Sequence, residues 1–81
     1  MITLYDFHGM NMHDKAAATW EGVYLGYRTD DQFTIQLYSI GSFYAEIFYD
    51  NLQNKIVKIR GFRSTTLVEP YLVSITLNAF E

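Results

Sequence analysis

From residue 23 to residue 62 apolar and polar side chains alternate along the chain, which is the period of a β-strand with two different sides. Four such runs are separated by short segments rich in Asp, Asn, Gly and Ser. Segments this short cannot hold the crossovers that parallel strands need, so the pattern predicts an antiparallel meander in the order 1-2-3-4. The strands are expected over residues 23–28, 32–39, 43–49 and 55–62.

A helix is expected over residues 11–22, ahead of the first strand. Asn11 is a good N-cap, and Asp14 follows in the first turn. Gly22 is a natural end of the helix. Trp20 lies on one helical stripe with two smaller apolar residues, at positions 12 and 16, so we expect it to anchor the helix in the core. Residues 1–10 would form an extended arm.

The chain after the last strand has two interpretations. Thr66-x-x-Glu69 resembles a capping box and precedes an apolar helical stripe, which favours a short helix over residues 66–76. Residues 73–77 are rich in β-branched side chains and alternate, so a final strand is the alternative. With the helix, residues 1–81 form a single α+β domain with an N-terminal helix, a four-stranded antiparallel β-meander and a short C-terminal helix.

The register of the strands is also predicted, because opposite residues of an antiparallel pair point to the same face. Loops of odd length align the apolar residues into a core face. Its rows would be Leu25, Ile35, Ile47, Val57 and Val23, Leu37, Ala45, Ile59, with Tyr27, Phe33 and Tyr49 alongside. The opposite face, the second face, would carry Tyr24, Tyr38, Tyr44, Phe48 and Arg60 together with the polar residues Gln36, Glu46 and Lys58. Glu46 would lie opposite Lys58 and form an ion pair between the third and fourth strands.

Two short motifs flank the meander. They are Trp20-Glu21-Gly22 before it and Phe62-x-Ser64-Thr65 followed by Glu69-Pro70-Tyr71-Leu72 after it. With the meander, these motifs resemble small uncharacterised bacterial single-domain proteins in which a Trp-containing helix precedes a β-meander. The resemblance covers residues 11–72. It implies the same single domain and brings no known activity.

The composition limits the class of protein. The 81 residues are 49% apolar, carry a net charge of -3 and include no cysteine, which fits one compact domain without disulfides or thiolate metal sites. No apolar run approaches the roughly 18–20 residues of a bilayer span. The N-terminus shows no basic flank followed by an apolar signal segment. We therefore expect a cytoplasmic protein that does not contact a membrane.

Candidate catalytic and metal-binding groups are few. Asp6, His8, His13 and Asp14 have the chemistry of metal ligands, but the two histidines are five residues apart across Gly9 and share no helical face. The hydroxyls at residues 64–66 are explained by helix capping, and no phosphate-binding glycine loop is present. We therefore expect no metal, no cofactor and no catalytic residue, which favours a non-enzymatic protein without excluding an enzyme.

The basic residues are clustered near the fourth strand. Lys55, Lys58, Arg60 and Arg63 are four of the six in the chain. Glu46 falls within this group, and the rest of the chain is acidic, so a phosphate backbone would be repelled. We expect no binding of nucleic acid.

The aromatic content of the second face is the feature that points to a function. Tyr and Arg are enriched at the centres of protein interfaces. The sequence thus predicts a small protein-interaction domain, a homodimer in the simplest case or a binder of another protein, with contacts through Tyr24, Tyr38, Tyr44, Phe48 and Arg60. Coverage of this face by the chain's own termini is the structural alternative. The functional alternative is a small-molecule or anion-binding domain, possibly catalytic, with the Tyr, Glu and Arg residues of this face as a pocket floor.

Overall fold

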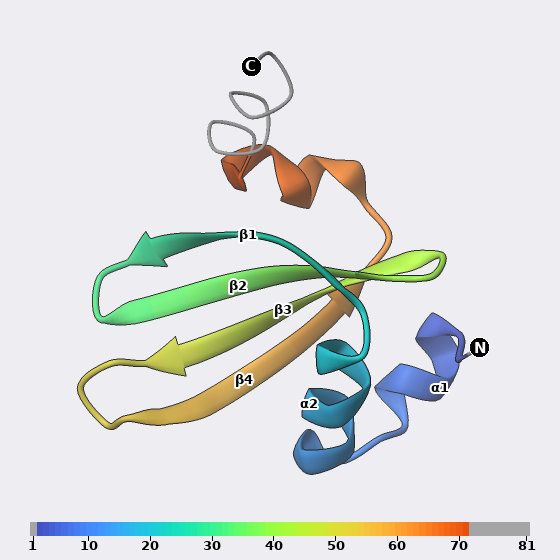
Figure 1. The fold of residues 1–81 in the computed structure, drawn as a ribbon, viewed down its shortest axis with the longest axis horizontal. Coiled ribbons are helices and arrows are strands. Elements are labelled where there is room, and N and C mark those ends of the chain that lie inside the picture. Colours follow the sequence, from blue (N-terminus) through green and yellow to red (C-terminus); the bar gives the residue numbers. More distant parts are fainter. Residues whose placement is uncertain (1, 72–81) are drawn as a thin grey trace.

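The computed structural model describes residues 2–71 and contains two helices, four strands and a final 3-10 helix (Figure 1). In order they are α1 (Leu4–His8), α2 (Met12–Trp20), β1 (Val23–Asp30), β2 (Phe33–Ile40), β3 (Phe43–Asp50), β4 (Lys55–Phe62) and η1 (Thr65–Tyr71). The strands form one antiparallel sheet in the order β1-β2-β3-β4, so the α+β meander is confirmed. The C-terminal helix is a 3-10 helix, and residues 72–76 of the expected helix or strand lie outside the described residues.

Both N-terminal helices are capped by side chains. Asn11 caps α2 as expected, because its side-chain oxygen accepts a hydrogen bond from the backbone N–H of Asp14 at 2.8 Å. The expected extended arm is wrong over α1, where Thr3 and Asp6 form a reciprocal capping box. This helix buries Phe7 against β4 so closely that a Cβ on Gly61 would lie 2.8 Å from the Phe7 ring.

The first two hairpins have two-residue turns instead of the expected three-residue loops. Asp30 pairs with Phe33 across the first turn, and Ile40 pairs with Phe43 across the second. The turn residues Asp31 and Gly41 adopt left-handed φ values of 57° and 58°, which lets the chain reverse this tightly.

The tight β2–β3 turn overturns the predicted core face. Ile35 pairs with Phe48 and Leu37 pairs with Glu46, instead of with Ile47 and Ala45. A register change of one residue moves a whole set of side chains to the other face of the sheet. The apolar residues of β2 and β3 are therefore divided between two faces.

The outer strands each carry a register shift. In β1 the shift lies between Tyr24 and Gly26, and Ile35 pairs with Arg28 instead of with the expected Leu25. In the third hairpin Ile47 pairs with Ile59 and not with Val57. Glu46 consequently lies opposite Arg60, two residues from the expected partner Lys58.

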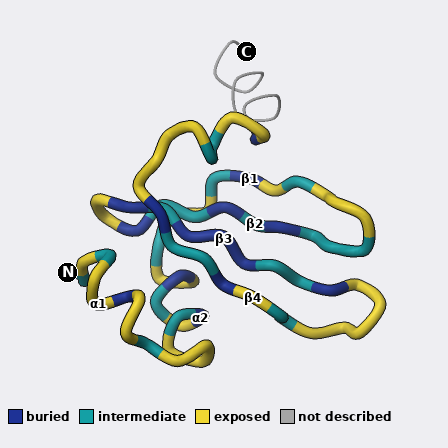
Figure 2. The backbone as a smooth tube through the Cα atoms, turned by 180° about the vertical axis from the view of Figure 1, so that it is seen from behind, coloured by how far each residue is buried: buried dark blue, intermediate teal, exposed yellow. Residues whose placement is uncertain are grey.

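Each face of the sheet has its own apolar core, and the buried residues concentrate in β2 and β3 (Figure 2). The helical face is covered by α1 and α2, and its buried residues are Phe7, Ala16, Ile40, Phe43, Ala45, Ile47 and Ile59. The η1 face is covered by η1, and its buried residues are Ile35, Leu37, Phe62 and Tyr71. The two ends of the described chain thus cover opposite faces.

Trp20 is not the core anchor that the sequence predicts. Its side chain is 57% exposed, whereas Ala16 and Thr19 are buried. The helix α2 meets the sheet along the Ala16–Thr19 stripe, and the buried Thr19 hydroxyl is satisfied because it donates to the Lys15 carbonyl at 2.7 Å. Trp20 therefore lies at the edge of the helix. The longest helix within residues 2–71, α2, has nine residues, fewer than a bilayer span requires.

The two-core arrangement predicts a large effect of truncating Leu37, which is 0% exposed on the η1 face. Leu37→Ala should lower the free energy of unfolding by about 2–5 kcal/mol, because it opens a cavity in a packed core. Leu52→Ala is the matched control, since Leu52 is 75% exposed in the β3–β4 connection. Urea unfolding of the two variants is the measurement, and equal midpoints would contradict the core assigned to the η1 face.

Candidate functional site

The structure divides the predicted partner-binding residues between the two faces. Tyr24 and Tyr38 pair with each other on the helical face, where their rings meet edge to face at 5.5 Å, and Gln36 lies on the same face. The other residues lie on the η1 face, and they are Tyr44, Phe48 and Arg60 with Glu46 and Lys58. The predicted single patch is therefore wrong, because the two-residue β2–β3 turn reverses the relation between the β2 and β3 side chains.

A buried carboxylate lies at the centre of the η1 face. Glu46 is 0% exposed, and its Oε1 atom accepts hydrogen bonds from Arg60 Nε at 3.0 Å and Arg60 Nη2 at 2.5 Å. Its Oε2 atom accepts a hydrogen bond from the Tyr71 hydroxyl at 2.5 Å. Arg28 Nη2 lies 3.6 Å from the same oxygen. These four residues are called the Glu46 cluster below.

The sheet and η1 together assemble the Glu46 cluster. Direct pairing of β3 with β4 brings Arg60 opposite Glu46, and η1 brings Tyr71 over the strands. Aromatic rings hold both guanidinium groups. That of Arg60 lies 5.9 Å from the centroid of Phe48, and that of Arg28 lies 5.6 Å from the centroid of Tyr71.

The environment of Tyr71 keeps its phenol protonated. Burial raises the pKa of Tyr71 above its usual value, and the hydrogen bond to Glu46 and the negative charge of that carboxylate raise it further. Burial also raises the pKa of Tyr38 on the helical face, with a smaller contribution from Tyr24. Tyr71 is therefore a fixed hydrogen-bond donor to Glu46.

The Glu46 cluster is better suited to holding η1 than to catalysis. Both carboxylate oxygens of Glu46 are bound by side chains of the protein, so neither is free to act as a base toward a solvent-side substrate. Within residues 2–71, the Nε atom of Arg28, a member of the cluster, is buried and has no hydrogen-bond partner. The cluster attaches η1 to the sheet through the buried Glu46 carboxylate, both of whose oxygens accept hydrogen bonds.

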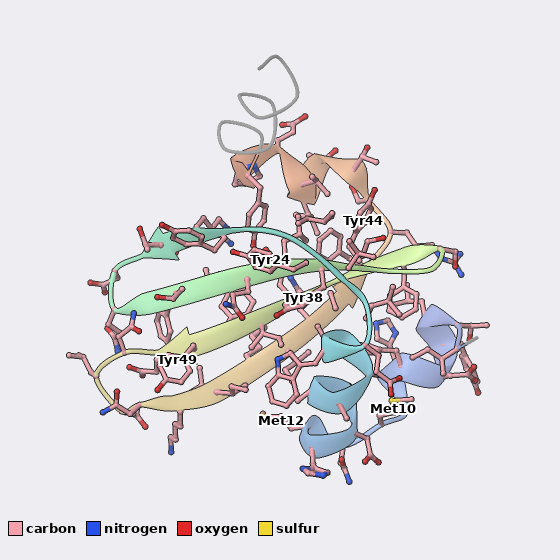
Figure 3. The ribbon with its side chains drawn as sticks, in the orientation of Figure 1. Met10, Met12, Tyr24, Tyr38, Tyr44 and Tyr49 are labelled. Atoms are coloured by element: carbon pink, nitrogen blue, oxygen red, sulfur yellow. The ribbon has the colours of Figure 1, made fainter. Side chains whose placement is uncertain are left out.

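The helical face leaves half of the sheet uncovered. The helices α1 and α2 lie over the half that contains the β2–β3 turn, and no element within residues 2–71 covers the half near the other two turns, called the bare half below (Figure 1). Trp20 borders a hollow of about 310 Å³ whose other lining includes Gln36, Ile47 and Tyr49. Met12 lies on the side of α2 that faces the bare half, and Tyr49 lies on the bare half itself (Figure 3).

Aromatic side chains dominate the exposed part of this face. Trp20, Tyr27 and Tyr24 are 57%, 55% and 50% exposed. Together with three half-buried neighbours they form a surface without a charged residue, called the aromatic surface below. Its members are Trp20, Tyr24, Tyr27, Gln36, Tyr49 and Ile56. The sequence pattern assigned Trp20, Tyr27 and Tyr49 to the core, so most of this surface was missed, whereas Tyr24 and Gln36 were expected on the second face.

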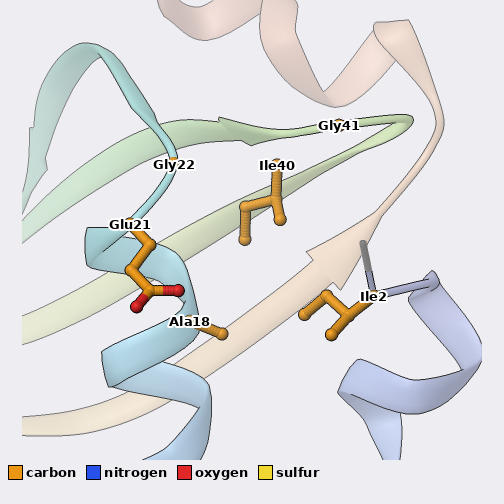
Figure 4. A pocket seen from close by; sticks show the side chains of 6 residues that line it. All are labelled: Ile2, Ala18, Glu21, Gly22, Ile40 and Gly41. Carbon is orange, nitrogen blue, oxygen red and sulfur yellow. The ribbon is translucent and has the colours of Figure 1, made fainter.

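Two further hollows flank the helices. One, of about 510 Å³, lies between α2 and the β2–β3 turn and is lined by apolar residues, with the single carboxyl group of Glu21 at its rim (Figure 4). Gly22, at its edge, has no room for a side chain, since a Cβ there would lie 2.5 Å from the Ser39 carbonyl oxygen. One carboxyl group beside aliphatic side chains provides no constellation for catalysis.

The second hollow, of about 820 Å³, is lined by three of the four residues that have the chemistry of metal ligands. They are Asp6, His8 and Asp14, whereas His13 does not line it. The Asp6 carboxylate is already used to cap α1, and these contacts hold its pKa below the usual range. Residues 2–71 contain no group of three or more His, Asp or Glu side chains placed to hold a metal ion.

Comparisons of the chain with protein-family models, with curated proteins and with solved structures give no match. The function of the domain is therefore inferred from its own geometry.

The raised pKa of Tyr71 predicts a pH dependence of stability. In the unfolded chain Tyr71 ionises near pH 10, whereas in the native state it keeps its proton to higher pH. The contribution of Tyr71 to the free energy of unfolding is therefore complete below pH 10. It is lost as the pH rises above 10, because only the unfolded state releases the proton. The Tyr71→Phe variant lacks this pH-dependent loss of stability. Urea unfolding from pH 8 to pH 11 should show a steeper decline for the wild type than for Tyr71→Phe, and parallel declines would contradict the assignment.

Proposed function

We propose that this chain is a protein-interaction domain that binds its partner through the aromatic surface. The observation that carries the proposal is the exposure of Trp20 at the end of α2 and of Tyr24 and Tyr27 on β1, each half exposed or more, around an uncharged part of the helical face. Trp and Tyr are the residue types that contribute most to binding at the centres of interfaces. An exposed aromatic patch of this kind is typical of surfaces that bind another protein.

The edges of the sheet support a contact through its face. The outer strands β1 and β4 both take part in register shifts, and Lys55 and Lys58 are exposed on β4. Bulges and lysines on edge strands oppose the addition of a further strand from another chain. A partner is therefore expected to bind over the sheet and not beside it.

The η1 face supports the alternative, a small-molecule or anion-binding domain, less well. Glu46 and Arg60 bind each other there, and Tyr71 occupies the space above the carboxylate. A ligand on this floor would have to displace η1 and separate groups that already satisfy one another. The aromatic surface requires no such rearrangement.

Site-specific photo-crosslinking in the cells that make the protein tests the proposal. A photoreactive phenylalanine analogue in place of Tyr27 should form a discrete protein adduct, whereas the same analogue in place of the exposed Lys58, on the η1 face, should not. Adding Trp20→Glu should abolish the adduct at position 27, because an unpaired charge is costly in a desolvated interface. Circular dichroism of the purified Trp20→Glu variant checks its fold. Equal adducts at both positions, or an adduct that survives Trp20→Glu, would contradict the proposal.

A further inference from the structure

We infer that the hollow beside Trp20 binds an uncharged sugar, a pyranose ring whose hydroxyl groups are equatorial. This site goes beyond the proposed function, because the hollow occupies only part of the aromatic surface. Tyr24 and Tyr27 lie outside its lining and remain available to a protein partner. The aromatic walls of the hollow, its hydrogen-bonding groups and its uncharged lining point to this ligand.

The hollow has an apolar floor and aromatic walls. Its floor lies on the bare half of the sheet, where Ile47 is 2% exposed and Ile56 is half-buried. Tyr49 lines it from β3, and Trp20 lines it from the end of α2 (Figure 3). Its volume of about 310 Å³ falls within the range of about 300–1,000 Å³ that is typical of small-molecule sites. A pyranose with equatorial hydroxyl groups presents C–H groups on both faces of its ring, and these pack against the electron-rich faces of aromatic side chains.

Three uncharged polar side chains border the same hollow, and they are Thr34, Gln36 and Asn51. The side-chain amide of Asn51 donates a hydrogen bond from Nδ2 to the Thr34 hydroxyl at 2.9 Å. The Thr34 hydroxyl keeps its own proton for donation, and Oδ1 of Asn51 is an acceptor. The half-buried amide of Gln36 adds a donor and an acceptor. The hollow can therefore both donate to and accept from the hydroxyl groups of a sugar.

The position of Asn51 is fixed, although it lies in the β3–β4 connection. Its backbone N–H donates to the Gln32 carbonyl at 2.9 Å, which continues the pairing of β3 with β2 beyond Asp50. Its side chain is held by Thr34. Polar groups that are held in place before binding lose little conformational entropy when a ligand binds. The rim of the hollow is thus organised in advance for hydrogen bonding.

The lining of the hollow favours a neutral ligand. Within residues 2–71, none of the side chains that line it is charged, although the chain as a whole has a net charge of -3. Phosphate groups bind best to Arg or Lys, so a phosphorylated sugar or a nucleotide fits this lining poorly. A purely apolar ligand would displace water from Thr34 and the two amides without replacing its hydrogen bonds. An uncharged ring that carries several hydroxyl groups matches both properties.

Trp20 provides the readout for a binding experiment, because it is the only tryptophan among the 81 residues and lines the hollow. The probe is methyl β-D-glucopyranoside, whose hydroxyl groups are all equatorial. It should change the Trp20 fluorescence in a saturable way, with a dissociation constant in the millimolar range that is expected for so small a ligand. Cyclohexanol, an apolar ring with one hydroxyl group, and adenosine, an uncharged planar heterocycle, should each bind about fivefold more weakly or less.

Thr34→Val and Thr29→Val form a matched pair on neighbouring strands of the helical face. Thr34→Val removes the hydroxyl group and the partner of Asn51, so it should raise the dissociation constant of the glucoside about fivefold or more. Thr29 pairs with Thr34 but lies outside the hollow, so Thr29→Val should change that constant by less than about twofold. Gln36→Met, which removes an amide of the rim, should weaken binding as Thr34→Val does. Circular dichroism checks the fold of each variant.

A Trp20 fluorescence that does not saturate with the glucoside would overturn the inference. Equal affinities of the folded Thr34→Val, Gln36→Met and Thr29→Val variants would also overturn it, as would cyclohexanol or adenosine binding as tightly as the glucoside. The crosslinking experiment tests the proposed function separately. A protein adduct at position 27 without sugar binding would leave the proposed function standing and overturn the sugar site, whereas sugar binding without an adduct would do the reverse.

Discussion

The pairing of β2 with β3 is the constraint on which the rest of the structure depends. The two-residue turn of Gly41 and Ser42 aligns Ile35 with Phe48 and Leu37 with Glu46. Because side chains alternate along a strand, this register divides the apolar residues between two faces, and neither face can be left wholly in water. The helices α1 and α2 cover one face and η1 covers the other. Within residues 2–71, the helices α1 and α2 are too small to cover the whole helical face. Its bare half therefore has no covering element.

The same register decides the environment of Glu46. On the η1 face its carboxylate meets Arg60 directly across the β3–β4 pair and meets Tyr71 from η1. A slip by one residue would turn Glu46 toward the helical face and leave Arg60 and Tyr71 without their partner. Burying an unpaired charge costs several kcal/mol, so the Glu46 cluster opposes the alternative register. The cluster thus contributes specificity of pairing as well as attachment of η1.

The bare half connects this folding constraint with the proposed function. A short chain buries a smaller fraction of its surface than a large one, and here the surface left over on the helical face is aromatic and uncharged. Trp20 is excluded from the core because Ala16 and Thr19 make the contact between α2 and the sheet. Its large ring lies instead beside the bare half. A partner bound there would cover the part of the helical face that residues 2–71 leave exposed.

The sequence by itself determined the strands, their order and the start of α2, because each depends on neighbouring residues. Alternation marks a strand, a short loop forces an antiparallel neighbour, and Asn11 caps the helix within its own first turn. Tertiary structure alone decided which face each side chain occupies. In β3 almost every position from Phe43 to Tyr49 is apolar, so the pattern fits either face, and the geometry of one turn makes the choice. The bond between Tyr71 and Glu46 joins residues 25 positions apart that have no local signal in common, and it forms only when the sheet and η1 meet.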